Sequence, residues 1–418
     1  MPYAEIISIG DELLIGQVIN TNAAWIGQQL SDAGITVRQH TVISDNEKQI
    51  LETLRKAAPS AALIVITGGL GPTRDDITKA ALCKYFDTKL VLHEASLENI
   101  MHLYQVRGYP MSKLNREQAE IPESCTAFRN LHGTAPGMWF EKAGVIYVSL
   151  PGVPFEMKPI LTDHVLPRLR ERFGGHAIIH KTVLTQGVGE SFIAEKIRDW
   201  EDRLPAHIKL AYLPQPGIVR LRLSGYGSDK GALHAEMQEQ LKRLRTLLSD
   251  LVFGYDEDTL EDVTGRMLLK LGKTLVTAES CTGGYLSHRI TAVPGSSAYY
   301  RGSIIAYSNE VKINILGVNA DLIEAHGAVS EQVVSNMALN VRKLLNADFA
   351  LAVSGIAGPA GGSEQKPVGT TWIALASEKE VVAEVFHLGE DRGRNIHKAA
   401  LSALNILRKA LLKELPPM

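Results

Sequence analysis

The sequence has few cysteines and no long apolar run, and both absences narrow the class of protein. Cys83, Cys125 and Cys281 are scattered without CxxC spacing, which argues against a disulfide framework and against a zinc site. No stretch approaches the roughly 18 apolar residues of a membrane span. The segment Met1–Glu5 also lacks the basic and apolar regions of a secretory signal. We therefore expect a cytoplasmic protein without a membrane partner.

The charge of the chain is also close to balanced. Its formal net charge is −2 at pH 7, with 45% hydrophobic and 22% charged residues. Such a balance gives no electrostatic reason to expect nucleic acid or an anionic lipid surface as a partner. At roughly 150 residues per domain, 418 residues predict two or three domains, each able to bury its own core.

Ser280 stands out among the residues that are present, because it follows a run typical of a buried strand, Lys273–Ala278. Two glycines, Gly283 and Gly284, then open a helical pattern, so the serine would lie on a strand-to-helix turn. Free backbone N–H groups and the helix dipole at such a turn can stabilise a developing oxyanion. Cys281 has no histidine near it in sequence to activate it, and we interpret it as a packing residue.

Lys312 is the candidate base for this serine. A second strand-like run, Gly302–Tyr307, ends at the good capping pair Ser308–Asn309, which places Lys312 in or near the first turn of a helix. There the helix dipole and desolvation would lower the pKa of the lysine until it can accept a proton from Ser280. Tyr307 would relay that proton or anchor the substrate. The alternative is a solvated surface lysine and a capping serine.

A glycine-rich loop follows a third strand-like run, Asp348–Val353. The loop spans Ser354–Gly362, and backbone N–H groups in such a loop can bind an anion, commonly a phosphate. Taken alone, the loop could equally be a flexible turn.

Six motifs in this order resemble the C-terminal domain of the competence/damage-inducible protein A (CinA) family: Thr277–Gly284, Ala306–Lys312, His326–Ser330, Ser354–Pro359, Lys366–Thr370 and Asp391–Arg392. The resemblance implies a nicotinamide mononucleotide deamidase without a cofactor. In it Ser280 is the nucleophile, Lys312 the base and Tyr307 a further catalytic residue. By their chemistry we assign substrate binding to Thr282, Gly283, Gly284, Ser354, Gly355, Ile356, Ala357, Gly358 and Arg392. Arg394 is the alternative to Arg392, because the segment Gly389–Arg392 carries one residue more than the family pattern.

The first half of the chain alternates between strand-like and helical segments. Strands are expected at Ala4–Ile9, Thr36–Ile43 and Ala62–Thr67, and helices at Glu47–Ala58 and after Asn20, with Ile26, Leu30 and Ala33 on one face. This alternation predicts an α/β fold with an open, mostly parallel, doubly wound sheet.

Acidic residues follow several of these strands, at Asp11–Glu12, Asp45 and Asp75–Asp76. A doubly wound sheet gathers such positions at the carboxyl edge of its strands, where ligands bind. Together with the glycine-rich segment Gly68–Thr73 they suit a phosphorylated ligand held with a divalent metal, Mg²⁺ or Co²⁺. For Asp45 a helix-capping role is about as well supported.

The segments Gly10–Glu12, Gly68–Asp76, Asn130–Gly137 and Leu150–Met157 resemble the molybdopterin-binding-like domain at the N-terminus of the same family. The resemblance leaves two functions open, pterin binding and hydrolysis of ADP-ribose to AMP and ribose 5-phosphate, and the carboxylates favour the second. The nucleotide-binding residues would be Gly10, Asp11, Asn22, Gly68, Gly69, Gly71, Thr73, Gly133, Pro151 and Gly152. The metal ligands would be Asp45, Asp75, Asp76 and Glu156.

We thus predict three domains: a molybdopterin-binding-like domain at 1–172, a small α+β domain at 173–254 and an α/β amidase domain at 255–418. The middle one shows strands at His180–Leu184, Ile208–Tyr212 and Ile218–Leu223, helices at Ser191–Trp200 and Lys230–Ser249, a turn at Leu213–Gly217 and an acidic linker at Tyr255–Asp258. It resembles the KH-like module of the family but lacks a Gly-x-x-Gly loop. We interpret it as a spacer that mediates homodimer formation, with RNA binding as the alternative. The competing function for the whole chain is a binding or scaffold protein of DNA uptake.

Overall fold

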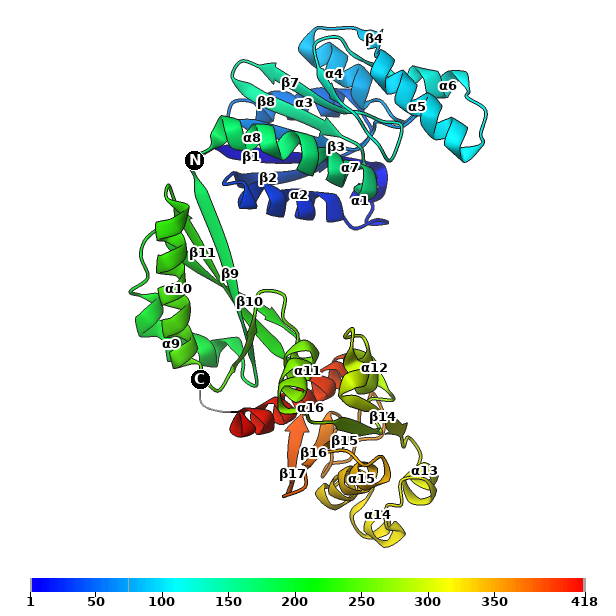
Figure 1. The fold of residues 1–418 in the computed structure, drawn as a ribbon, viewed down its shortest axis with the longest axis vertical. Coiled ribbons are helices and arrows are strands. Elements are labelled where there is room, and N and C mark those ends of the chain that lie inside the picture. Colours follow the sequence, from blue (N-terminus) through cyan, green and yellow to red (C-terminus); the bar gives the residue numbers. More distant parts are fainter. Residues whose placement is uncertain (1, 74, 416–418) are drawn as a thin grey trace. The chain divides into compact units, whose positions relative to one another are not determined.

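The computed structural model describes residues 2–73 and 75–415, and the chain divides into two compact units (Figure 1). The N-terminal unit comprises Met1–Ile179 and Gly225–Glu236, and the C-terminal unit comprises His180–Ser224 and Met237–Met418. Most of the segment expected to be a separate spacer therefore belongs to the C-terminal unit.

The N-terminal unit is built on six strands: β1 (Tyr3–Ile9), β2 (Thr36–Ile43), β3 (Leu63–Thr67), β6 (Thr126–Phe128), β7 (Gly137–Lys142) and β8 (Val145–Leu150). They form one sheet in the order β2-β1-β3-β8-β7-β6. In this order the neighbours β2, β1, β3 and β8 pair in parallel, and β7 is antiparallel to both of its neighbours. A two-residue hairpin turn, Ala143–Gly144 with positive φ at both residues, causes the reversal between β7 and β8. The predicted doubly wound sheet is confirmed, with an antiparallel edge.

Helices cover both faces of this sheet, as the fold class requires. They are α1 (Asp11–Leu14), α2 (Thr21–Asp32), α3 (Glu47–Ala57), α4 (Thr78–Phe86), α5 (Glu94–Arg107), α6 (Lys113–Glu117), α7 (Pro154–Ile160) and α8 (Leu166–Phe173), with a π-helical turn at Leu161–Val165 and a hairpin of β4 (Leu90–Leu92) and β5 (Glu120–Pro122). In β3, Leu63 and Val65 pack with α2, α7 and α8, whereas Ile64 and Ile66 pack with α3 and α4. Every residue of β3 is therefore buried, and its sequence shows no alternation of apolar and polar residues.

The sheet of the C-terminal unit contains β13 (Leu275–Glu279), β14 (Tyr300–Ile305), β15 (Phe349–Gly355), β16 (Thr370–Ala376) and β17 (Val381–His387), in the order β14-β13-β15-β16-β17. The first three strands of this order are parallel, and the last two are antiparallel additions. The helices are α11 (Leu260–Leu271), α12 (Tyr285–Thr291), α13 (Asn309–Asn314), α14 (Ala320–His326), α15 (Glu331–Leu344) and α16 (Arg392–Glu414), with a 3-10 turn at Ser296–Ala298.

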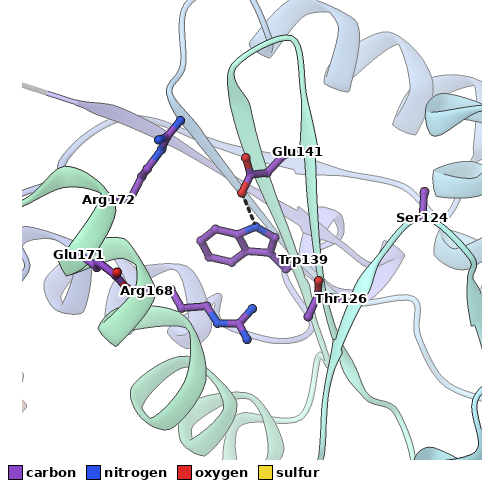
Figure 2. A pocket seen from close by; sticks show the side chains of 7 residues that line it. All are labelled: Ser124, Thr126, Trp139, Glu141, Arg168, Glu171 and Arg172. Carbon is purple, nitrogen blue, oxygen red and sulfur yellow. Dashed lines mark hydrogen bonds between the residues drawn. The ribbon is translucent and has the colours of Figure 1, made fainter.

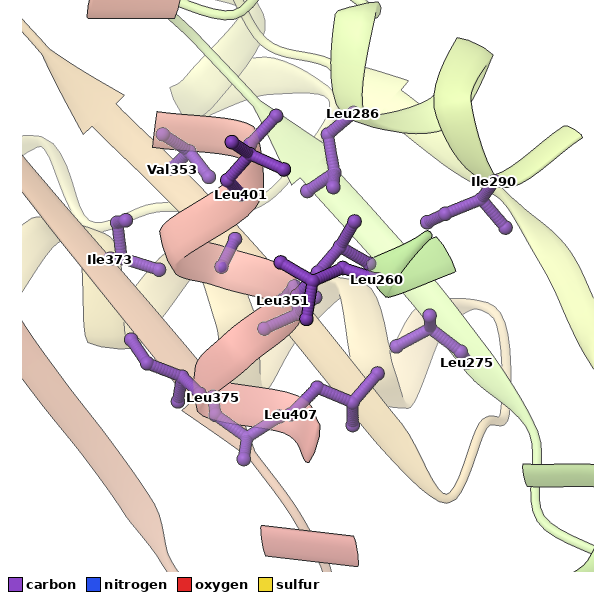
Figure 3. Close-up of a cluster of buried hydrophobic side chains, with 14 of the residues drawn as sticks. Leu260, Leu275, Leu286, Ile290, Leu351, Val353, Ile373, Leu375, Leu401 and Leu407 are labelled. Carbon is purple, nitrogen blue, oxygen red and sulfur yellow. The ribbon is translucent and has the colours of Figure 1, made fainter. Parts of the chain in front are cut away.

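The central strand β15 separates two apolar layers. Leu351 and Val353 face α11, α12 and α16, and Figure 3 shows this layer with Leu286, Ile290, Leu401 and Leu407 around them. Ala350 and Ala352 face the opposite layer, which α15 covers with Val333 and Met337. Because both faces are covered, the parallel strands end at an edge that can hold polar groups.

The middle segment consists of β9 (Ala177–Gln186), α9 (Glu190–Glu201), β10 (Ile208–Gln215), β11 (Ile218–Gly227), α10 (Lys230–Leu247) and β12 (Val252–Tyr255). Its sheet order is β10-β11-β9-β12. The sequence did not indicate β12, because the strand is short and contains Gly254. The expected acidic linker consequently begins inside a strand, since Tyr255 pairs with Val183.

The middle segment shares its core with the C-terminal sheet. Leu184 and Phe253 belong to the same buried cluster as Leu351. Arg408 of α16 is 3% exposed, and its guanidinium donates to the carbonyl oxygens of Val252 and Asp250, at 3.1 Å each. These contacts explain why the two segments form one compact unit. No helix in the described ranges is long and apolar enough to cross a membrane.

Candidate active sites

Ser280 and Lys312 come together although 32 residues separate them in the sequence. Ser280 directly follows β13, and Lys312 lies on α13, whose N-terminus is capped by the hydroxyl of Ser308. Lys312 Nζ is 3.1 Å from Ser280 Oγ. The lysine is 1% exposed and the serine 9% exposed, so the surface-lysine alternative does not hold.

Burial lowers the pKa of Lys312. The side chain forms no ion pair with any described residue, and its Nζ donates to the carbonyl oxygens of Ala306, at 2.9 Å, and Tyr307, at 3.2 Å. A neutral amine has two N–H bonds for these carbonyls and one lone pair for the hydroxyl proton of Ser280. All three contacts of Lys312 therefore persist when it loses its proton. The helix dipole contributes less than we expected, because α13 has only six residues.

The turn that carries Ser280 is held by Glu279, a residue that the sequence did not indicate. Glu279 is fully buried, and its carboxylate accepts hydrogen bonds from the backbone N–H groups of Gly284, Leu286 and Ser287 at 2.8–3.0 Å. The hydroxyl of Ser287 donates to the same carboxylate. These four bonds fix the start of α12 relative to β13.

This arrangement corrects the expected oxyanion site. The amides at the start of α12 are engaged by Glu279 and, for Tyr285, by Thr282 O, so they cannot serve a substrate. The amide of Ser280 donates to Val353 O at 2.9 Å. Among the described residues, the amide of Thr282 has no hydrogen-bond partner and the amide of Cys281 contacts only its own thiol, and both adjoin the serine. These two amides are the candidate oxyanion donors.

Cys281 is a buried packing residue. It is 8% exposed, and burial raises the pKa of its thiol to about 12. A thiol that stays protonated is a poor nucleophile, so the geometry favours Ser280.

Arg392 connects the glycine-rich loop to Tyr307. One guanidinium nitrogen donates to Gly358 O at 2.8 Å, and the other donates to the hydroxyl of Tyr307 at 3.1 Å. Arg394 donates its backbone N–H to Asp391 instead, and no contact of its side chain is found in the described structure. Of the two arginines, Arg392 is therefore the one placed at the loop.

Within the loop, some predicted binding residues have structural partners. The hydroxyl of Ser354 donates to Ala328 O at 2.7 Å, and Ile356 donates its N–H to Thr370 O. Asn395, which the sequence did not indicate, is 2% exposed and donates to Ala357 O at 3.0 Å. Gly355 ends β15, and the Cβ of any other residue there would lie 2.6 Å from Thr371 Oγ1. The amides of Ala357 and Gly358 remain without partners in the described part of the chain.

The N-terminal unit has a cavity of about 420 Å³ at the carboxyl edge of its parallel strands. Nine of the predicted residues line it: Gly10, Asn22, Asp45, Gly68, Gly69, Gly71, Asp75, Asp76 and Gly152. Asp11, Thr73 and Pro151 are not part of this lining, but each shares a hydrogen bond with a residue of it. Asp11 N donates to Asp45 Oδ2 at 3.1 Å, and Thr67 Oγ1 donates to Pro151 O at 3.0 Å.

Carboxylates are concentrated at this cavity. Burial raises the pKa of Asp45, and the negative charges of Asp11, Glu12 and Asp75 add to the effect. We expected Asp76 to be a metal ligand. Instead, its two carboxylate oxygens accept hydrogen bonds from the N–H groups of Gly71, at 2.7 Å, and Thr73, at 2.8 Å. Asp76 thus shapes the glycine-rich segment Gly68–Thr73.

Glu156 and Gly133 do not line the cavity. Glu156 accepts a hydrogen bond from Asn130 Nδ2 at 2.7 Å, and a Cβ at Gly133 would come within 1.9 Å of Glu156 Oε2. The described residues contain no group of three or more His, Cys, Asp or Glu side chains that could hold a metal ion. The four predicted ligands therefore do not form a metal site by themselves.

The N-terminal unit has a second, shallower cavity of about 670 Å³, which contains none of the predicted residues (Figure 2). Trp139 and Arg168 line it, and the indole N–H of Trp139 donates to Glu141 at 3.1 Å.

Together these features define a multidomain α/β protein with a buried serine–lysine pair in one unit and an acidic cavity in the other. The chain belongs to the CinA family. The family model of the CinA C-terminal domain matches residues 257–411, that of the probable molybdopterin binding domain residues 5–171, and that of the damage-inducible protein CinA KH domain residues 180–254.

Relatives match over almost the whole chain. A CinA-like protein of Cytophaga hutchinsonii is 50% identical, over 98% of this chain and 98% of its own. A putative competence-damage inducible protein of Caldicellulosiruptor saccharolyticus is 39% identical, over 98% of this chain and 99% of its own. A crystal structure of a competence or damage-inducible protein from Enterobacter asburiae is 35% identical, with 37% of this chain and 99% of that chain covered and a TM-score of 0.36.

Glu279→Gln tests whether the carboxylate holds the turn. The variant places an NH₂ group against backbone N–H donors, and we expect it to lower the free energy of unfolding by about 1–3 kcal/mol. Urea unfolding followed by tryptophan fluorescence measures the change. Glu310→Gln, at an exposed position of α13, is the matched control and should leave the midpoint unchanged. Equal midpoints for both variants would show that Glu279 does not stabilise the turn.

Proposed function

We propose that the C-terminal unit hydrolyses the carboxamide of nicotinamide mononucleotide, giving nicotinate mononucleotide and ammonia. One observation carries the proposal: the amine of the buried Lys312 lies 3.1 Å from the hydroxyl of Ser280. A nucleophile and base at this distance suit acyl transfer, and burial lowers the pKa of the base.

In the proposed mechanism Ser280 Oγ attacks the carboxamide carbon while its proton moves to Lys312 Nζ. The oxyanion of the tetrahedral intermediate accepts hydrogen bonds from the amides of Cys281 and Thr282. Lys312 then returns the proton to the leaving nitrogen, ammonia departs, and an ester to Ser280 remains. A water molecule adds to this ester with Lys312 again as base, and the nicotinate carboxylate leaves as Ser280 regains its proton.

Arg392 supports the choice of a phosphorylated substrate. Its guanidinium is anchored by Gly358 and Tyr307, which leaves further N–H groups for an anion. The unpartnered amides of Ala357 and Gly358 supply neighbouring donors. Tyr307, 60% exposed, orients Arg392 in this proposal and takes no proton.

We propose further that the N-terminal unit hydrolyses ADP-ribose to AMP and ribose 5-phosphate with a divalent metal. Asp45 and Asp75 would hold the metal, with substrate oxygens completing its coordination, because Mg²⁺ is commonly bound by one or two carboxylates plus phosphate. The metal would neutralise charge on the pyrophosphate. The chain itself supplies the glycine-rich segment Gly68–Thr73, which Asp76 shapes. It also supplies Asn22, whose Nδ2 donates to Gly152 O at 2.6 Å and closes the cavity wall.

Removal of either member of the serine–lysine pair should abolish deamidation. We expect Ser280→Ala and Lys312→Ala each to lower kcat/KM by at least about a thousandfold, since the two groups act as one unit. Ammonia release from nicotinamide mononucleotide measures the rate, and circular dichroism verifies folding. Cys281→Ala is the control and should retain activity within about threefold. If Cys281→Ala were as damaging as Ser280→Ala, the cysteine would be the nucleophile.

The pH dependence of deamidation should report the lysine. Because burial lowers the pKa of Lys312 from its ordinary value of 10.5, the neutral and active form is already present below that pH. We expect kcat/KM to rise with pH through the lowered pKa, with the midpoint of the rise below pH 10.5. Lys312→Arg should be inactive at every pH, because arginine stays protonated. A rate that is independent of pH, or an active Lys312→Arg variant, would exclude this role.

Asp45→Asn separates the two functions of the N-terminal cavity. If a metal joins Asp45 to the pyrophosphate, the variant should need about tenfold more Mg²⁺ or Co²⁺ for half-maximal hydrolysis of ADP-ribose. Asp32→Asn, at the exposed end of α2, is the control and should behave as wild type. Hydrolysis that persists in EDTA and is unchanged in Asp45→Asn would contradict the metal role. Absence of hydrolysis together with pterin binding would favour the binding function.

A further inference from the structure

The C-terminal unit contains a third cleft, of about 630 Å³, away from Ser280 and Lys312. One wall comes from the β9–α9 loop and the β10–β11 turn, and the other from β17 and α16. The walls meet closely where the turn crosses α16, because a Cβ at Gly217 would lie 3.0 Å from Leu401 and 3.6 Å from Lys398. Gly217 has φ +82°, which a glycine adopts without strain. The cleft volume is in the range of small-molecule sites.

Three buried polar side chains line this cleft with unused hydrogen-bonding atoms. Gln186 is 6% exposed, and its buried Oε1 has no partner among the described residues. Asn405 is 5% exposed and accepts from Arg408 Nε at 2.9 Å, but its Nδ2 donates to no described residue. Ser402 is 6% exposed, and its hydroxyl likewise has no described partner. Buried polar groups are normally satisfied, so the open Oε1 of Gln186 indicates a ligand, and Nδ2 of Asn405 and the hydroxyl of Ser402 offer it further hydrogen bonds.

Charge and shape restrict the chemistry of that ligand. Lys398 and Lys409 lie on the same face of α16 as Ser402 and Asn405, and each lines the cleft. Lys398 donates to Leu388 O at 2.9 Å, whereas Lys409 is exposed and pairs with no described carboxylate. Glu190 and Glu384 are the acidic residues of the lining, and neither is ion-paired within the described ranges. The lysines thus remain available to an anion.

The apolar part of the lining offers an aromatic surface. Phe386 of β17 is half-buried and lines the cleft beside the aliphatic side chain of Ile406. Side-chain amides pair in the plane of a nucleobase with its donor and acceptor edge, and aromatic rings stack on its face. Phosphate oxygens accept from lysine ammonium groups. A nucleotide combines all three features.

We propose that this cleft is a binding site for a nucleotide, with the base at Gln186 and Asn405 and the phosphate at Lys409, one helical turn from Asn405. The site is distinct from the serine–lysine site and from the acidic cavity. The proposal concerns binding alone, and it does not depend on the amidase activity. The same helix α16 begins at Arg392, so the cleft and the glycine-rich loop share one rigid element.

Photolabelling of the full chain with 8-azido-adenosine 5′-monophosphate tests the site, since the labelled peptides identify the location. We expect label in segments 186–190, 214–219, 384–388 or 398–409, which exclude Arg392, and competition by AMP. Adenosine and inorganic phosphate should each compete at least about tenfold more weakly than AMP, because each lacks half of the contacts.

Variants of α16 supply the matched comparison. Lys409→Glu should weaken labelling of these segments about tenfold, and Lys413→Glu, one turn further on and outside the cleft, should not. Asn405→Asp keeps the acceptor for Arg408 and removes the open donor, so it should weaken labelling as well. Absence of label from these segments, or equal labelling of Lys409→Glu and Lys413→Glu, would overturn the proposal. Stronger competition by a short single-stranded RNA than by AMP would replace it with an RNA interface.

Discussion

The chemistry of the C-terminal unit depends on one constraint, the burial of an amine without a counter-ion. A buried ammonium group is costly unless an anion accompanies it, and Lys312 has two backbone carbonyls and a hydroxyl instead. That environment favours the neutral amine, and the neutral amine can still form all three hydrogen bonds. A carboxylate beside the lysine would instead have raised its pKa and removed its use as a base. Glu279 is adjacent to Ser280 in the sequence, but the start of α12 engages the oxygens of its carboxylate.

Glu279 therefore has a positioning role that explains the shape of the site. A strand must change into a helix within five residues after Ser280, and the first amides of a helix require acceptors. A capping side chain inside the turn would have met this need locally. Here the last residue of β13 does so from the core, which leaves the turn free of bulky caps and the amides beside Ser280 open. Gly283 and Gly284, at φ +59° and +97°, make that turn sterically accessible.

The sequence predicted several strands, and the positions of Ser280 and Lys312 after two of them, because apolar runs and capping residues are local signals. Apolar runs that end at polar or glycine residues indicated β1, β2, β3 and β15, and capping pairs indicated α2 and α13. The unpredicted features depend on distant partners. The sequence gives no sign that Arg408 binds carbonyls of Val252 and Asp250, or that the oxygens of Asp76 are used by its own loop. β12 was missed because four residues including a glycine carry little β signal.

The two proposed sites treat charge in opposite ways, and their substrates explain why. A carboxamide is neutral, so its proposed hydrolysis uses a neutral base and an oxyanion site, and Lys312 and the amides beside Ser280 are the candidates for these roles. A pyrophosphate is anionic, yet the N-terminal cavity collects Asp45 and Asp75, with Asp11 and Glu12 adding negative charge. Carboxylates so close to one another repel both each other and such a substrate. We therefore expect a cation to accompany an anionic ligand that binds among them.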